Sequence, residues 1–382
     1  MRDVRDGPRG DEVRFAADER FPWRRVLRLA ERAIAARRLD LSGLRVLTEA
    51  ATGYQRLTPV IAALAGADEV YAVGRDSAGA SRRDAEAQTA WLAGVAGVQD
   101  RVHLVTTRLQ APLQTIDIVT DLPGVRPVDE SIVRNLTTGA VVTLMRGAAA
   151  WRAADVDVAS CRRAGIPVAG LDEDAVGLYR WTALAAVHGL LGLGIEIAGA
   201  TLAVAGDGPA YGHVVRALAQ LGARILVATP DNAGRVTLFG GEKIGEDLGD
   251  EAARACLAEA EALVVCPGEP DRRVIGPVAE VDAARLAAAA PHLTVVWLAG
   301  EIDRRGLAAA GLASWPADGP AAPADLLPQA VVEVHTAGLK VGEVMARARQ
   351  RGSSPPVVEE LAAAEAHAEL LPMDLTPRRR EA

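Results

Sequence analysis

A glycine-rich stretch in the second half of the chain constrains the fold more than any other feature. The apolar segment 201–205 reads as a strand and runs directly into the residues Gly206, Asp207, Gly208, Pro209, Ala210, Tyr211 and Gly212. In a strand–loop–helix unit the first glycine permits a tight turn, the second lets backbone N–H groups reach a phosphate, and the last allows close packing of helix on strand. The stretch therefore predicts a phosphate-binding loop in a parallel α/β sheet.

The end of the next predicted strand, 224–228, bears on the ligand. It is followed by Thr229, Pro230 and Asp231, with Arg235 a little further on. Domains that bind NAD usually place Asp or Glu at this strand end to bind the ribose hydroxyls, whereas an uncharged residue with a nearby arginine suits a 2′-phosphate. The sequence thus predicts a Rossmann domain that binds NADP or NAD and slightly favours NADP. Asp231 as a ribose ligand stays an alternative.

Two later predicted strands, 262–266 and 293–298, should contribute further cofactor-binding residues. Parallel strands bring their carboxyl ends to one edge of the sheet, which is where ligands bind. The residues expected there are Cys266, Pro267, Ala299 and Gly300.

Apolar runs alternate with helical patterns through both halves of the chain, and 382 residues are enough for two domains. This alternation predicts α/β architecture with two doubly wound parallel sheets. The expected parts are a flexible N-terminus (1–20), a flavodoxin-like substrate domain (21–180), a Rossmann NAD(P)-binding domain (181–338) and C-terminal helices that pack back on the first domain (339–382). Segment 330–334 is expected to be the last strand of the second domain.

Composition excludes several classes of function. A net charge of −8 leaves no basic stripe for nucleic acid. Three widely spaced cysteines fit neither a disulfide framework nor a zinc site, and they suit a reducing cytoplasm. No apolar run is long enough for a membrane span. We therefore expect a cytoplasmic protein without metal, membrane or nucleic-acid partners.

Three segments together resemble the D-isomer-specific 2-hydroxyacid dehydrogenase superfamily. Segment 154–168 is similar to the end of that family's substrate domain, the glycine stretch follows at the family's spacing, and segment 332–338 resembles its histidine-bearing strand end. The resemblance implies hydride transfer between a nicotinamide and a small polar or acidic substrate in an interdomain cleft, by a homodimer. Segment 299–303 bears a weaker similarity to S-adenosylhomocysteine hydrolase.

The family's functional side chains map only in part onto this sequence. By the resemblance, His335 is the acid/base for the hydroxyl proton, and Asp318 is the carboxylate that orients it. A strand-end histidine with a structural hydrogen bond is the alternative for His335. The family's arginine, which binds the substrate carboxylate, is replaced here by Ala299.

Other residues of the first domain are candidates for substrate binding. Thr52, Gly53 and Tyr54 follow the predicted strand 45–48, and Arg126 lies in the loop after the predicted strand 116–120. Arg146 ends the predicted strand 140–145. The two arginines together would suit an acidic or phosphorylated substrate.

Three functions remain open at this point. The first is an NAD(P)-dependent oxidoreductase of the 2-hydroxyacid dehydrogenase type. The second is a lyase or hydrolase that uses bound NAD for transient oxidation, which Glu301 and Asp303 would favour. The third is a dinucleotide-binding protein without turnover, which the missing arginine would favour.

Overall fold

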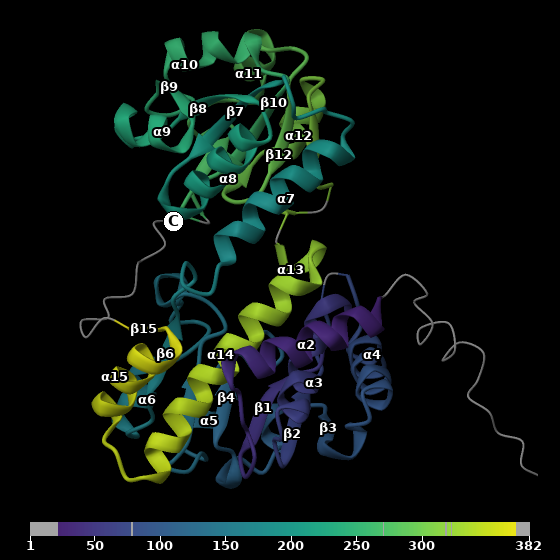
Figure 1. Cartoon of the computed structure of the whole chain (residues 1–382), viewed down its shortest axis with the longest axis vertical. Helices are drawn as coiled ribbons and strands as arrows, with labels where there is room; N and C mark the ends of the chain where they lie inside the picture. Colours follow the sequence, from purple (N-terminus) through teal and green to yellow (C-terminus); the bar gives the residue numbers. More distant parts are fainter. Residues whose placement is uncertain (1–21, 78, 270, 318, 322, 372–382) are drawn as a thin grey trace, which may run out of the picture. The chain divides into compact units, whose positions relative to one another are not determined.

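The computed structural model describes residues 22–371, except 78, 270, 318 and 322. The chain divides into two compact units: unit 1 comprises Met1–Val176 and Pro328–Ala382, and unit 2 comprises Gly177–Leu327. Each unit is built on a parallel sheet (Figure 1). The predicted fold class, two doubly wound α/β domains, is confirmed. Unit 2 begins after residue 176 and ends at residue 327, whereas the sequence predicts that the second domain begins after 180 and ends at 338.

One seven-stranded sheet forms the centre of unit 1, in the order β15-β6-β5-β4-β1-β2-β3. Its strands are β1 (Arg45–Glu49), β2 (Glu69–Val73), β3 (Val102–Val105), β4 (Ile118–Thr120), β5 (Val141–Thr143), β6 (Val168–Leu171) and β15 (Ala368–Leu370). Strand β15 is antiparallel to β6, and the other pairs are parallel.

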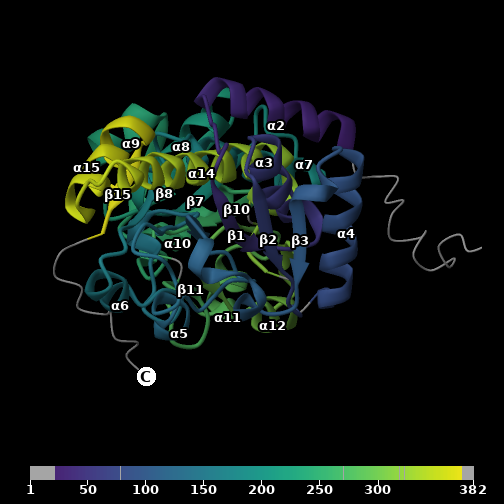
Figure 2. The same ribbon diagram turned by 90° about the horizontal axis from the view of Figure 1, so that it is seen from below.

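Along the chain, the six parallel strands of unit 1 have the order 3-2-1-4-5-6. This is the order of dinucleotide-binding domains, whereas flavodoxin has the order 2-1-3-4-5. The prediction of a flavodoxin-like first domain is therefore wrong in strand order. The difference lies in the third strand, β3, which pairs with β2 rather than with β1. Figure 2 shows β3 at this edge of the sheet with α4 beside it.

Seven α-helices are described in unit 1. They are α2 (Trp23–Arg37), α3 (Leu57–Leu64), α4 (Arg82–Val95), α5 (Glu130–Val133), α6 (Val158–Arg163), α14 (Pro328–Gln350) and α15 (Pro355–Ala366). The long helix α14 packs on α2, α3 and the strands β4 to β6 (Figure 1). Two glycines permit this close approach, because a Cβ on Gly338 would collide with Met145 and one on Gly342 would lie 2.7 Å from Ile118.

Segment 330–334 lies inside α14, so the predicted strand is wrong. Val331, Val332 and His335 are buried with helical spacing. A short apolar run of this kind has the same composition whether it is a buried strand or the buried face of a helix. Tertiary packing against the sheet decides in favour of the helix.

Unit 2 has a six-stranded parallel sheet in the order β14-β12-β10-β7-β8-β9. Its strands are β7 (Thr201–Gly206), β8 (Arg224–Ala228), β9 (Gly241–Gly245), β10 (Ala262–Cys266), β12 (Thr294–Trp297) and β14 (Ala313–Trp315), and β11 (Arg273–Ile275) pairs separately with β13 (Glu301–Ile302). The helices are α7 (Leu178–Gly192), α8 (Gly208–Gln220), α9 (Ala233–Phe239), α10 (Glu251–Cys256), α11 (Ala283–Ala289), α12 (Arg304–Ala309) and α13 (Pro323–Leu326).

The central strands of unit 2 are buried on both faces. Along β7, Leu202 and Val204 belong to one apolar cluster, and Ala203 and Ala205 belong to another on the opposite face. Counted along the chain, the strand order is again 3-2-1-4-5-6. Both units thus reverse their strand order between the first and fourth strands, the place where such sheets bind ligands. None of the described helices is long and apolar enough to cross a membrane.

Candidate functional site

The predicted phosphate-binding loop is the junction between β7 and α8. Strand β7 ends at Gly206 and helix α8 begins at Gly208, so Asp207 alone connects them. Gly208 has a φ of 70°. A Cβ on Gly206 would collide with the carbonyl oxygen of Cys266. Both positions therefore require glycine, as a tight phosphate-binding turn does.

Helix α8 begins earlier than the sequence suggests. Pro209, Ala210, Tyr211 and Gly212 lie in its first turns rather than in a loop. Pro209 has no N–H, so the free donors at this helix terminus come from Gly208 and Ala210. Gly212 packs on the ring of Phe239, from which a Cβ would be only 2.8 Å away. An anion at this terminus would also meet the positive end of the helix dipole.

The loops after β10 and β12 lie beside this junction. A Cβ on Gly208 would lie 3.0 Å from the Cα of Gly268, and one on Gly300 would lie 2.6 Å from Cγ of Pro267. The N–H of Ala299 donates to the carbonyl of Val265 over 3.2 Å. The structure thus brings together cofactor-binding residues that were expected from three separate segments, namely Gly206, Gly208, Cys266, Pro267 and Gly300.

Arg272, which the sequence does not single out, also lies at this junction. Its Nη1 is 2.9 Å from Oδ2 of Asp207, and its Nε donates to Oε1 of Glu280 over 2.6 Å. The N–H of Gly268 donates to Oδ1 of Asp207 over 2.6 Å. Burial raises the pKa of Glu280. Asp207 and Glu280 together hold a guanidinium group close to the start of α8.

The residues expected at the ribose follow β8, as predicted from the sequence. Thr229 is fully buried and Pro230 is exposed. The carboxylate of Asp231 accepts a hydrogen bond from the hydroxyl of Tyr211, and its Oδ2 is 3.2 Å from Nε of Arg235. Burial, followed by the hydrogen bond with Asp231, raises the pKa of Tyr211 to about 12. The phenol therefore stays a hydrogen-bond donor that positions Asp231.

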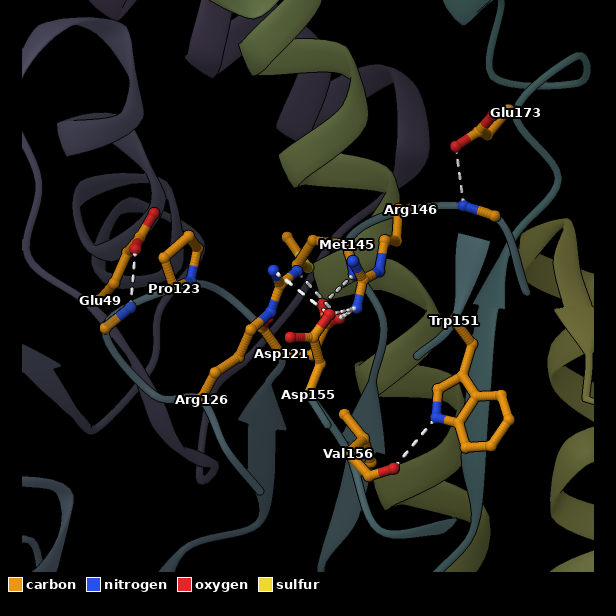
Figure 3. A network of polar contacts seen from close by, with 12 residues as sticks. Glu49, Asp121, Pro123, Arg126, Met145, Arg146, Trp151, Asp155, Val156 and Glu173 are labelled. Carbon is orange, nitrogen blue, oxygen red and sulfur yellow. Dashed lines mark hydrogen bonds and ion pairs between the residues drawn. The ribbon is translucent and has the colours of Figure 1, made fainter. Parts of the chain in front are cut away.

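In unit 1 the expected substrate-binding arginines meet in one cluster of charges (Figure 3). Nη2 of Arg146 is 2.9 Å from Oδ2 of Asp121 and 2.7 Å from Oδ2 of Asp155. Nη2 of Arg126 is 3.3 Å from Oδ2 of Asp121, and its Nη1 is 3.6 Å from Oδ2 of Asp155. We call these four residues the charge cluster. The sequence points to its two arginines and misses both aspartates.

The charge cluster lies where β4 and β5 end. Asp121 directly follows β4, is fully buried and accepts the N–H of Met145 over 2.7 Å. Arg146 comes three residues after the end of β5 at Thr143. This is the carboxyl edge of the sheet, next to the reversal of strand order between β1 and β4, where sheets of this topology bind ligands.

Glu49, the last residue of β1, adds a third acidic group to this edge. Its side chain is almost fully buried, and its Oε2 accepts the N–H of Gly124 over 3.0 Å (Figure 3). Burial raises the pKa of Glu49 to about 7, against the opposing effects of the Gly124 hydrogen bond and the charge of Arg126. A carboxyl with a pKa near neutrality at a strand end is typical of groups that exchange protons.

The loop after β1 is already engaged with a neighbouring helix. Gly53, Tyr54 and the two residues after them form a 3₁₀ turn (Gly53–Arg56), and Thr52 precedes it in an extended conformation. The N–H of Gly53 donates to Oε1 of Gln88 over 3.2 Å. This backbone donor, which was expected to face the substrate, is therefore used inside unit 1.

His335, the expected acid/base, does not lie at the end of a strand, where the sequence places it. His335 belongs to α14 of unit 1, is buried, and has its Nδ1 2.5 Å from Oγ1 of Thr58. Burial lowers the pKa of His335 to about 4, so the imidazole is neutral at physiological pH. Asp318 lies outside the described residues. Nowhere in the described parts of the chain do three or more His, Cys, Asp or Glu side chains form a metal-binding group.

No protein-family model matches this sequence, and neither does any curated protein. Among solved structures, a dipicolinate synthase from Bacillus halodurans is similar at a TM-score of 0.53 and 17% identity, over 81% of this chain and 99% of that one. A dipicolinate synthase from Bacillus subtilis gives a TM-score of 0.54 and 15% identity, over 83% and 100%. D-lactate dehydrogenase from Escherichia coli has a TM-score of 0.48 and 13% identity, over 82% of this chain and 99% of that one.

These similarities extend over most of the chain. The two dipicolinate synthase chains are similar over nearly their whole length. At such low identities the likeness concerns the fold. The chain has the two-unit Rossmann-type fold of these proteins.

Proposed function

We propose that unit 2 binds a nicotinamide dinucleotide and that the protein is an NAD(P)-dependent oxidoreductase that acts on a small acidic substrate. The observation that supports this most directly is the junction of β7 and α8, where Gly206 and Gly208 allow a tight turn against the loop after β10 and α8 begins two residues after the strand ends. A bound dinucleotide would supply the hydride chemistry. Gly208, Ala210 and Arg272 would contact its pyrophosphate, and Asp231 its adenosine ribose.

For the form of the cofactor, the ion pair between Asp231 and Arg235 supports NAD. The sequence favours NADP slightly, because Thr229 is uncharged and Arg235 could serve as a cation for the 2′-phosphate. The pair largely neutralises that cation, and a 2′-phosphate would also approach the carboxylate of Asp231. A 2′-hydroxyl would instead donate a hydrogen bond to this carboxylate. We therefore propose NAD as the preferred form.

The charge cluster of unit 1 supports an acidic substrate. Arg126 and Arg146 present two guanidinium groups at the carboxyl edge of the sheet, which suits recognition of a carboxylate. They replace the arginine that is absent at Ala299. The neighbours with the higher TM-scores are named for the synthesis of a carboxylate, dipicolinate. The acidic groups at this edge are Asp121, Asp155 and Glu49. We propose Glu49 for proton exchange, because its pKa of about 7 is nearer to neutrality than the pKa of about 4 of His335.

The other two functions gain no support from the structure. The side chain of Asp303 caps α12 by accepting the N–H of Gly306 over 2.9 Å. Glu301 is paired with Arg273 over 3.4 Å. Both acids, which would favour transient oxidation, have structural partners. The absence of an arginine at Ala299, which would favour a protein without turnover, is offset by the arginines of unit 1. We propose, by the resemblance, a cytoplasmic homodimer.

Binding titrations of the purified protein with NADH and NADPH test the cofactor assignment. We expect saturable binding that is tighter for NADH, and oxidation of NADH on addition of a 2-oxo acid from a small panel. Asp231→Ser should narrow or reverse the preference between the two cofactors. Failure of both cofactors to bind at millimolar concentration would refute the proposal. Tighter binding of NADPH would overturn only the choice between them.

A further inference from the structure

The charge cluster of unit 1 has an inner and an outer carboxylate. Asp121 is fully buried beneath the two arginines, whereas the side chain of Asp155 is 20% exposed. The side chains of the two arginines are exposed to a similar degree, 23% for Arg126 and 19% for Arg146. Asp121 is thus a fixed counterion, and Asp155 is the carboxylate of the cluster that solvent reaches.

The balance of charge makes the outer carboxylate replaceable. With Asp155 in place, two arginines and two aspartates give a neutral cluster. Without it, the two guanidinium groups would share one buried carboxylate and carry a net positive charge. A cation pair of this kind at the rim of a sheet binds a carboxylate by charge-assisted hydrogen bonds.

Arg146 also has a donor to spare. Among the residues that the structure describes, none accepts a hydrogen bond from its Nε, although that atom is buried. A buried N–H donor without an acceptor is unfavourable. The Nη2 of the same guanidinium lies within hydrogen-bond distance of both aspartates. Asp155 therefore satisfies the arginine only in part.

We propose that Arg126 and Arg146 form a carboxylate-binding site that Asp155 fills in the protein alone, and that the carboxylate of an acidic ligand takes its place. This inference builds on the proposed function, since that ligand is the substrate. The class of ligand follows from the occupant, because the side chain of aspartate is an acetate group on the chain. The site therefore takes a small planar carboxylate, and Asp155 sets its affinity by competing for the same two guanidinium groups.

Chemical rescue with acetate tests the site directly and needs no cofactor. Asp155→Ala removes the internal occupant, so acetate should raise the melting temperature of this variant saturably, with a millimolar midpoint, more than equal chloride does. Wild-type protein should show a midpoint at least roughly tenfold higher, because Asp155 competes. If Asp155→Ala folds only when acetate is present, that dependence is itself the expected rescue. No rescue by acetate beyond that of chloride would overturn the proposal.

Two variants serve as controls for the rescue. Asp155→Ala combined with Arg146→Gln removes one of the two guanidinium groups and should lose the response to acetate. Asp129 is paired with a single arginine, Arg108, over 2.9 Å in the same unit. Asp129→Ala should therefore show no saturable response. An equal response in Asp129→Ala would mean that acetate stabilises unit 1 by a general effect, and this too would overturn the proposal.

The link to the substrate is tested separately. Asp155→Asn keeps the shape of the side chain but loses its charge, so the KM for an acidic substrate should fall about tenfold while NADH binding stays unchanged. A purely structural ion pair predicts no fall in KM. If acetate rescues Asp155→Ala but no dinucleotide binds, the carboxylate site stands and the proposed function fails. If dinucleotide and turnover are present but rescue and the fall in KM are absent, the proposed function stands and this inference fails.

Discussion

Units 1 and 2 have the same strand order, yet their first and fourth strands meet differently at the carboxyl edge. In both, an acidic side chain just after or at the end of the first strand accepts the N–H of a glycine in the loop after the fourth. Glu49 accepts that of Gly124 over 3.0 Å, and Asp207 accepts that of Gly268 over 2.6 Å. The same kind of hydrogen bond therefore joins the first strand to the loop after the fourth strand in both units.

The difference lies in what surrounds these strand ends. In unit 1, Gly124 packs against the backbone of Val73 and against Glu49, so the loop after β4 covers the ends of β1 and β2. In unit 2, Gly208 and Gly268 approach each other through their backbones, and α8 begins with free N–H donors. The same topology thus presents charged side chains at its carboxyl edge in unit 1 and backbone donors in unit 2.

The largest expected effect is that of a side chain at the unit 2 junction. Gly208→Val places a branched side chain at φ 70°, against the Cα of Gly268. It should weaken NADH binding by about 4 kcal/mol, since roughly two charge-assisted hydrogen bonds to phosphate would be lost. Gly53→Ala is the matched control in unit 1, because Gly53 also has a positive φ, 59°, but open space around it. Equal loss of NADH binding in both variants would mean that the junction in unit 2 has no special part in binding.

Glu49→Gln should have the next largest effect, on the stability of unit 1. The folded pKa of Glu49 is about 7, above its ordinary value of 4.5, so the folded state keeps the proton between these values. The free energy of unfolding of the wild-type protein therefore falls as the pH rises from 4.5 through 7. At pH 8 the variant should be more stable than wild type by up to about 3 kcal/mol, with little difference at pH 4. Urea denaturation at both pH values measures this, and equal curves at pH 8 would show that Glu49 titrates normally.

His335 should have a smaller effect on stability, and with the opposite dependence on pH: stability falls as the pH falls. Its folded pKa is about 4, below the ordinary 6.5, so protons bind the unfolded chain more readily as the pH falls. Wild-type protein should lose about 2 kcal/mol between pH 7 and pH 5, and His335→Asn should lose less. At pH 7.5 the variant should retain turnover if the histidine is structural. Lost turnover at an unchanged melting temperature would instead restore the acid/base role expected from the sequence.

The sequence predicts most of the parallel strands, because buried strands such as 224–228 and 262–266 are short apolar runs between helical patterns. It misses β9 and β14, which are less buried. It also predicted the glycine junction, whose residues are contiguous. The error at 330–334 arose because such a run does not distinguish a strand from a buried helix. The expected role of His335 depended on that strand.

The charge cluster and Arg272 show what local patterns leave out. Asp121 and Asp155 are 34 positions apart, and each looks like an ordinary loop aspartate in the sequence. Arg272 is 65 positions from Asp207. Only the order of the strands brings such residues to one edge of a sheet. The sequence could therefore indicate the arginines of unit 1 but not the acids that hold them.

Substitution of Arg272 should give the smallest of the four effects. It tests how much a side-chain cation adds to the backbone donors of unit 2 in NADH binding. Asp207 and Glu280 each accept from its guanidinium and hold it beside the start of α8. Arg272→Gln should weaken NADH binding about tenfold, or 1.4 kcal/mol, and Arg272→Lys should recover part of it. Arg273→Gln is the matched control, since that neighbouring side chain is 65% exposed and paired with Glu301. The loss should shrink at high salt, because it comes from attraction between charges. Equal affinities for Arg272→Gln and Arg273→Gln would mean that unit 2 holds the phosphates by its backbone alone.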